Sequence, residues 1–170
     1  MDTLEAIRTR RSIRKFQDRP VPEELIQKVL AAAMSAPSAR NAQPWQFIVI
    51  TDRELLTEIP QVNPNAPMAA HAAAAILVCG DLSLEKSQGF WPVDCAAAVE
   101  NLLLAAHALG LGAVWTGIYP RQPRIDGFRR LLGLPENIIP HSLVPLGYPA
   151  EQPPGEDRYK AERVRRERWA

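Results

Sequence analysis

Residues 93–118, VDCAAAVENLLLAAHALGLGAVWTGI, carry the strongest helix signal in the chain and lead directly into a strand. Apolar residues recur through 93–109 at the spacing of one helix face, which predicts a core stripe at Cys95, Val99, Leu102, Ala106 and Leu109. Gly110 is typical of a helix end. Residues 112–118 are then predicted to form a strand, so this stretch places a long buried helix beside a sheet.

The segments on either side extend this pattern. Runs of β-branched and apolar residues predict further strands at 46–51, 75–80 and 139–147. Apolar periodicity and end signals predict helices at 3–9, 53–59, 67–73 and 122–132, and one from Pro22 to the residues before Pro37. Because helices flank several strands, we expect one α+β domain over residues 1–170, with a helix-covered mixed sheet.

The composition of the sequence argues against several functional classes. The net charge of +1 argues against a dedicated nucleic-acid binder, which usually has a strongly basic domain. The longest apolar run, Ala69–Cys79, contains His71 and falls short of the roughly 20 residues that a membrane span needs. The sequence starts without the apolar region of a signal peptide. Cys79 and Cys95 lie in apolar segments, so we expect buried free thiols and a cytoplasmic protein.

The first candidate site is the run Arg10-Arg11-Ser12-Ile13-Arg14. Three guanidinium groups and a hydroxyl just past a short helix suit a phosphate, because guanidinium forks match phosphate oxygens. A solvated basic face is the alternative interpretation.

The second candidate is PSARNAQPW at residues 37–45, which lies between a helix end and a strand start. Asn41 and Gln43 each carry a donor and an acceptor, as a heteroaromatic ring with alternating N–H and C=O edges, such as an isoalloxazine, requires, and Trp45 offers a flat apolar surface. An ordinary turn followed by a core tryptophan would also explain this segment.

The third candidate is GLGAVWTGI at residues 110–118, where glycines permit close approach of the backbone to a ligand. A dinucleotide-binding fingerprint is absent, because that motif would open a helix and this segment enters a strand. A helix cap followed by a strand is the alternative.

The long helix also carries polar pairs, Asp94 with Asn101 and Glu100 with His107, each seven residues apart and so on one face. Buried polar groups need partners, which could be a ligand or other groups of the chain. The three histidines stand alone in sequence, without the spacing of metal ligands, so we expect no metal site.

Four motifs, taken in order, give the sequence a family resemblance. RTRRSIRKF, APSARNAQPWQF, GLGAVWTGIYP and VPLGYPAE resemble the FMN-dependent nitroreductase family over about residues 3–169. This resemblance implies an α+β fold with a mixed, mainly antiparallel sheet covered by helices on both faces. It also implies an intertwined homodimer with FMN at each of two interfaces, in which residues of about 150–170 form an extension that packs on the partner subunit.

The resemblance further implies roles for particular residues. The FMN phosphate and ribityl chain would be held by Arg10, Arg11, Ser12 and Arg14. The loop that reaches the flavin from the partner subunit would present Pro37, Ser38, Asn41 and Gln43. The segment along the isoalloxazine ring would be Trp115, Thr116 and Gly117, with the backbone of Gly117 near flavin N5. Arg158, or alternatively Lys160, would be the C-terminal basic residue at the phosphate.

The implied activity is transfer of electrons from NAD(P)H through FMN to nitroaromatic, quinone or similar small acceptors by a ping-pong mechanism. FMN carries this chemistry, which fits a sequence without a catalytic triad or metal motif. The chain lacks the helical insertion that longer relatives place over the flavin. A specialised reaction on the same fold, such as reductive dehalogenation or dehydrogenation, and flavin binding without turnover are the alternatives.

Overall fold

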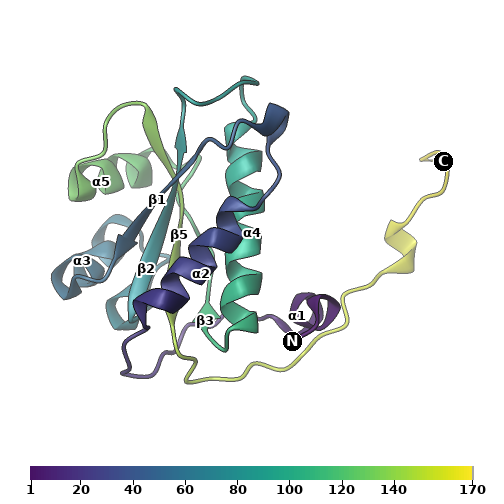
Figure 1. The fold of residues 1–170 in the computed structure, drawn as a ribbon, viewed down its shortest axis with the longest axis horizontal. Helices are drawn as coiled ribbons and strands as arrows, with labels where there is room; N and C mark the ends of the chain where they lie inside the picture. Colours follow the sequence, from purple (N-terminus) through teal and green to yellow (C-terminus); the bar gives the residue numbers. More distant parts are fainter. Residues whose placement is uncertain (170) are drawn as a thin grey trace.

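The computed structural model describes residues 1–169 and has an α+β fold built on one five-stranded sheet, as expected (Figure 1). Four strands lie side by side in the order β1 (Trp45–Ile50), β2 (Ala74–Asp81), β5 (Ile138–Gly147) and β3 (Gly112–Ala113). A further strand, β4 (Thr116–Gly117), also pairs with β5. Every pairing between these strands is antiparallel, so the sheet itself is antiparallel, and an isolated parallel bridge joins Ser12 to Ala113 outside the named strands.

The single strand expected at 112–118 is in fact two short strands in one register. Gly112 pairs with Gly147 and Gly117 with Ser142, so Val114 falls opposite Pro145. Proline has no backbone N–H to donate, and the ladder of hydrogen bonds is interrupted there. The interruption leaves Trp115 outside the regular strands.

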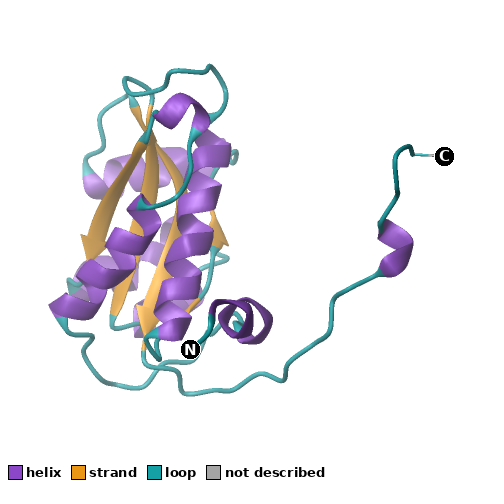
Figure 2. Cartoon of the chain, turned by 45° about the vertical axis from the view of Figure 1, so that its right-hand side comes forward, coloured by secondary structure: helices purple, strands orange, loops and turns teal. Residues whose placement is uncertain are grey.

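Helices cover both faces of the sheet (Figure 2). On one face lie α2 (Glu23–Met34) and α4 (Trp91–Ala108), and on the other α3 (Arg53–Val62) and α5 (Gln122–Leu132). Successive side chains of a strand point to opposite faces. Thus Ile76 and Val78 of β2 pack in the core under α2 and α4, whereas Leu77 and Cys79 pack in the core under α3 and α5.

Both cysteines are buried and free, as predicted. Burial raises the pKa of Cys79 to about 12 and also raises the pKa of Cys95. They are therefore small core residues without reactive thiolates. Within residues 1–169, no helix is both long and apolar enough to cross a membrane.

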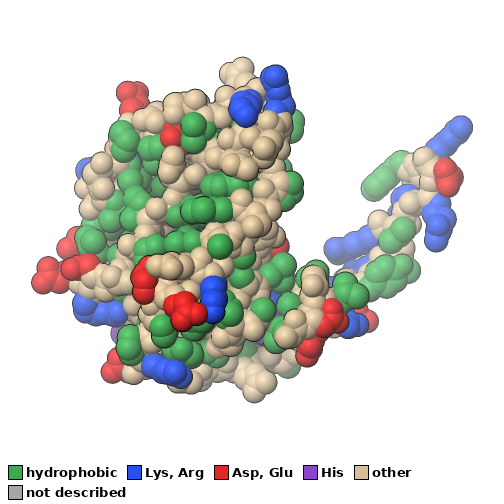
Figure 3. Space-filling view, in the orientation of Figure 1, with side chains coloured by type: hydrophobic (Ala, Val, Ile, Leu, Met, Phe, Trp, Pro, Cys, Tyr) green, Lys and Arg blue, Asp and Glu red, His purple; other side chains and the backbone are tan. Residues whose placement is uncertain are grey.

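The N-terminal helix and the chain just after β5 lie at one edge of the fold. The N-terminal helix α1 (Thr3–Thr9) lies beside the last turn of α4, and the chain after β5 returns along the same edge (Figure 1). Beyond this edge the tail extends away from the body and carries the short helix η3 (Ala161–Arg163). In the space-filling view, Lys and Arg side chains gather along this tail (Figure 3).

Candidate functional site

A cavity of about 710 Å³ lies where the segment after α1 meets the chain after β5. Its charged and hydroxyl side chains are Arg11, Ser12, Arg14, Lys15, Glu151 and Arg158. The short helix η2 (Pro67–His71) supplies another wall, including His71. The cavity therefore brings together four of the residues predicted at the phosphate, and its lining has four permanent cations against one carboxylate.

The Arg11 side chain donates to backbone carbonyls of two segments, and one of its nitrogens has no acceptor within residues 1–169. Its Nε donates to the carbonyl of Pro154 at 3.0 Å, and its Nη1 donates to the carbonyls of Arg8 at 2.9 Å and Arg10 at 2.6 Å. Its Nη2 is buried and meets no acceptor within residues 1–169. Buried donors are normally paired, so this nitrogen, which lies next to Gly155, lacks the acceptor that a buried donor usually has among residues 1–169.

Arg10 points elsewhere. Its Nε lies 3.6 Å from Glu100 on α4, and it does not line the cavity. One residue earlier, Thr9 Oγ1 lies 2.8 Å from His107 Nε2. Burial, followed by the charge of Arg10, lowers the pKa of His107. These contacts hold α1 against the second half of α4. Glu100 and His107 therefore have polar partners within the chain.

The segment predicted along the flavin ring starts at this cavity and runs away from it. Ser12 bridges to Ala113, and Gly117 lies four residues further, about 13 Å along an extended chain. Thr116 is buried, and its Oγ1 donates to the carbonyl of Leu143 at 2.8 Å. Trp115 is 37% exposed, and a Cβ added at Gly117 would meet nothing within 4 Å. Trp115 and Gly117 thus form an open surface further along the chain from Ala113, which is bridged to Ser12 of the cavity lining.

His141 lies buried behind this surface. Its ring centroid is 5.7 Å from that of Trp115 and 6.1 Å from that of Trp91. Burial lowers the pKa of His141 to about 4, so its ring is neutral near pH 7. His141 therefore supports Trp115 as a neutral aromatic group.

The predicted loop at 37–43 has a strained backbone. It contains the short helix η1 (Ala39–Asn41), and Arg40, Asn41 and Gln43 have φ of 53°, 51° and 49°. Such left-handed backbone costs on the order of 1 kcal/mol or more for a non-glycine residue and clusters at functional sites. The N–H of Gln43 donates to Ser38 Oγ at 2.9 Å, and Gln43 Nε2 donates to Asn41 Oδ1 at 3.1 Å. With Pro37, Asn41 and Gln43 exposed, the loop presents polar groups on a fixed backbone.

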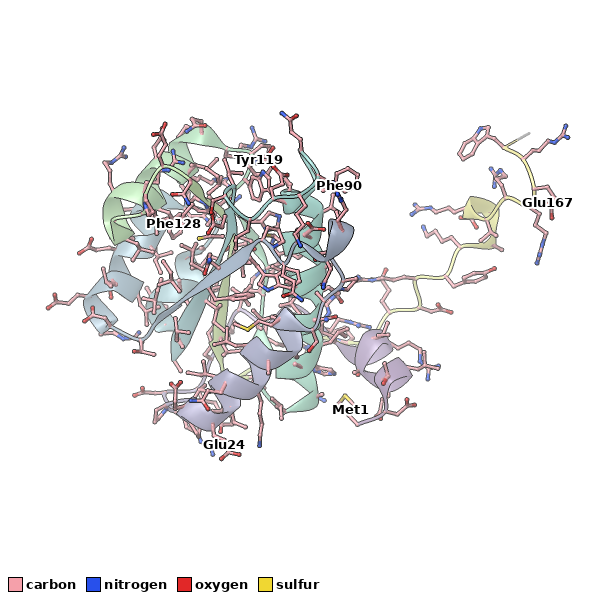
Figure 4. The ribbon with its side chains drawn as sticks, turned by 45° about the horizontal axis from the view of Figure 1, so that its top comes forward. Met1, Glu24, Phe90, Tyr119, Phe128 and Glu167 are labelled. Carbon is pink, nitrogen blue, oxygen red and sulfur yellow. The ribbon has the colours of Figure 1, made fainter. Side chains whose placement is uncertain are left out.

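This loop lies far from the cavity in the same chain. The backbone N–H of Ala39 donates a hydrogen bond to Asp94 in the first turn of α4, whereas α1 contacts His107 in the last turn. Thirteen residues of helix separate these two contacts, about 20 Å. Figure 4 shows Phe90 and Met1 near these opposite ends. One chain therefore does not bring the predicted loop and phosphate residues together.

Comparisons with known proteins agree with these features. The model of the family described as "Nitroreductase family" matches two overlapping stretches, residues 7–77 and 60–148. A protein of Methanothermobacter thermautotrophicus named "Putative NADH dehydrogenase/NAD(P)H nitroreductase" is 58% identical over 99% of this chain and 88% of its own length. The chain belongs to the nitroreductase family.

Other nitroreductases are similar at greater distance. An "Oxygen-insensitive NADPH nitroreductase" of Salmonella typhimurium is 33% identical over 95% of this chain and 72% of its own length. The structure of an "FMN-dependent Nitroreductase" from Clostridium difficile R20291 superposes with a TM-score of 0.91 at 27% identity, over 98% of this chain and 99% of that one. The fold expected from the four motifs is thus confirmed.

Two residues near the site are not identified by the sequence. His141 stands alone in sequence, and its place beside Trp91 and Trp115 depends on tertiary packing. Glu151 lies in the family motif VPLGYPAE. Its place in the cavity depends on pairing between the two ends of the chain, which no local pattern reports.

Proposed function

We propose that this nitroreductase is an FMN-dependent oxidoreductase that takes electrons from NAD(P)H and passes them to small acceptors such as nitroaromatics or quinones. The main observation in support is the cationic cavity at Arg11, Ser12 and Arg14, from which the bridge between Ser12 and Ala113 leads along the chain to the open surface at Trp115 and Gly117. A phosphate at one end and a flat ring at the other match that shape and chemistry. The Salmonella and Clostridium relatives, named for NADPH and FMN, support the same choice of cofactors.

The residues present fit FMN. The side chains of Arg11, Ser12 and Arg14 would hold the phosphate, and Arg158 would add a further cation from the tail. The ring would lie beside Trp115 and Gly117, where a Cβ built on the glycine would meet nothing within 4 Å. When bound, FMN supplies reversible electron transfer between nicotinamide and acceptor, while the protein binds and orients both partners.

We also propose that two copies of the chain build each site. The strained loop at 37–43 would reach the flavin of the partner subunit, since its contact with α4 lies about 20 Å along that helix from the contact that holds α1. The tail after Pro153 would pack on that subunit, since Tyr159 is 74% exposed and Trp169 is 85% exposed in the isolated chain. Leu4 and Ile7 of α1 are exposed as well, which supports burial against a second copy.

The activity is tested on the purified full-length protein. We expect a visible flavin spectrum as purified or after reconstitution with FMN, anaerobic bleaching by NADH or NADPH, and turnover of several nitroaromatics or quinones. A colourless protein that cannot be reconstituted would refute the proposal. Bound FMN that neither nicotinamide reduces would favour a flavin-binding protein without turnover, and turnover of a single specialised acceptor would favour the dedicated reaction.

The shared site is tested by mixing two inactive variants. One carries Arg14→Ala in the cavity and the other carries Asn41→Ala with Gln43→Ala in the loop. If each site combines both chains, half of a random mixture is heterodimer with one intact site, and about a quarter of wild-type activity returns. No recovery in verified heterodimers, or a monomer by light scattering, would refute the shared site.

A further inference from the structure

The wall of the cavity is built by pairing between two distant segments. Phe16 bridges to Pro149 in antiparallel fashion, and the N–H of Gln17 donates to the carbonyl of Tyr148 at 2.9 Å. The N–H of Ala150 donates to the carbonyl of Lys15 at 2.9 Å. We call residues 148–155 the strap. It lies along the N-terminal segment that carries the predicted phosphate residues.

Glu151 of the strap faces the backbone of that segment. Its Oε1 accepts hydrogen bonds from the N–H of Arg14 at 2.5 Å and from the N–H of Lys15 at 3.1 Å. The bond from Arg14 lowers the pKa of Glu151, which keeps the side chain ionised near pH 7. One carboxylate oxygen therefore fixes two successive peptide units at the point where Arg14 enters the cavity.

A carboxylate beside an anion site needs a physical reason. Glu151 repels a phosphate by its charge, yet its bonded oxygen is already engaged by two N–H groups, and four cationic side chains line the same cavity. Because these two N–H groups are taken, recognition of a phosphate falls to the side chains of Arg11, Ser12 and Arg14. The contribution of Glu151 to phosphate binding must then be geometric, through the two peptide units whose N–H groups donate to it.

We propose that Glu151 is a positioning residue for the FMN phosphate, which fixes the backbone of Arg14 and Lys15 so that the Arg14 side chain is directed into the cavity. This inference rests on the proposed function. It assigns selectivity for the phosphorylated flavin to a contact between the two ends of the chain. Binding of the flavin ring beside Trp115 and Gly117 should not depend on this contact.

Three variants of the protein distinguish the positioning effect of Glu151 from the effect of its negative charge. Glu151→Met keeps the length of the side chain but offers only a weak sulfur acceptor, whereas Glu151→Gln keeps a carbonyl oxygen and removes the charge. Glu58→Gln, an exposed carboxylate on α3, is the matched control. Far-UV circular dichroism and thermal unfolding establish that each variant is folded, and fluorescence titration gives Kd for FMN and for riboflavin.

We expect Glu151→Met to raise the Kd for FMN by about tenfold, the usual order for losing a hydrogen bond to a charged group, with the Kd for riboflavin unchanged. Glu151→Gln should restore FMN binding to near the wild-type value, or improve it, because both N–H groups keep an acceptor and the repulsive charge is gone. The ratio of the two Kd values is the decisive quantity.

Three outcomes would overturn this inference and leave the proposed function standing. Wild-type FMN affinity in Glu151→Met, or equal weakening of FMN and riboflavin, would show that Glu151 does not direct the phosphate-binding side chains. A Gln variant as weak as the Met variant would also refute positioning through these two bonds. If the wild-type protein binds no FMN, the proposed function itself fails.

Discussion

Asp94 accepts a hydrogen bond from the backbone N–H of Ala39 at 2.8 Å, and its side chain is buried among core residues of α4. This contact attaches the strained loop at 37–43 to the first turn of the longest helix. It explains how three non-glycine residues with positive φ persist at an exposed position: the surrounding structure fixes their backbone.

Replacing Asp94 by alanine should therefore destabilise the protein and loosen the loop. The N–H of Ala39 would lose its partner, so we expect the free energy of unfolding to fall by about 1–3 kcal/mol in urea titration. Asp94→Asn retains an oxygen acceptor and should lose less. Asp18→Ala, at an exposed position, is the control. Equal stability of Asp94→Ala and wild type would contradict this account.

Gly117→Ala should weaken FMN binding and leave the fold intact. A Cβ at this position meets nothing within 4 Å in the chain, so the thermal midpoint of the FMN-free protein should be unchanged. A flavin against this strand would instead meet the added methyl group, and the Kd for FMN should rise. Unchanged FMN affinity would place the ring elsewhere. The contrast with Gly112→Ala is useful, because a Cβ there would lie 2.6 Å from Ile13 Cγ2 and should destabilise the fold.

The arginines of the N-terminal run should differ in their effects. Arg14 lines the cavity, so Arg14→Ala should raise the Kd for FMN by about 10–100-fold, as expected for losing charged hydrogen bonds to phosphate. Arg10 faces Glu100 outside the cavity, so Arg10→Ala should have a smaller effect on this Kd. Arg130→Ala on α5 controls for net charge. A larger effect at Arg10 than at Arg14 would argue against the cavity as the phosphate site.

The stability of the protein should depend on pH through His141. Its pKa is lowered to about 4 in the folded protein, from an ordinary value near 6.5. Between these values the unfolded chain binds a proton that the folded chain does not, so stability falls as the pH falls. The loss approaches about 3 kcal/mol when the pH reaches the folded pKa.

His141→Phe keeps an aromatic ring beside Trp115 and cannot bind this proton. We expect the difference in unfolding free energy between wild type and variant to shift in favour of the variant as the pH is lowered from about 6.5 to 4. Urea titrations at several pH values measure this difference, in which the other titrating groups cancel. A difference that is constant across the range would contradict the neutral buried state.

Local patterns predicted much of the fold. The helical spacing of Cys95, Val99 and Leu102 located α4, and Gly110 fixed its end, because these signals need only near neighbours in sequence. The same holds for Arg11, Ser12 and Arg14, which share one segment and reach one cavity. The interruption between β3 and β4 was missed, since it depends on a proline in the paired strand, about 30 residues away by register.

The orientation of single side chains in the site was less predictable. Arg10 and Arg11 are adjacent in sequence, yet one faces Glu100 and the other clamps the strap, because their environments come from α4 and from the chain after β5. Glu151 and Arg14 are 137 residues apart, so no periodicity relates them. Family resemblance supplied the roles, and tertiary contacts decide which residues can perform them.

Pairing of the strap with residues 14–17 also sets an order of events in biosynthesis. Residues 11–15 leave the ribosome early, but the segment that completes their cavity is made 137 residues later, as the separation of Arg14 and Glu151 shows. A nascent or truncated chain that ends before the strap lacks Glu151, Pro153 and Arg158 of the cavity lining. The proposed FMN phosphate site can therefore be completed only on chains whose synthesis is nearly finished.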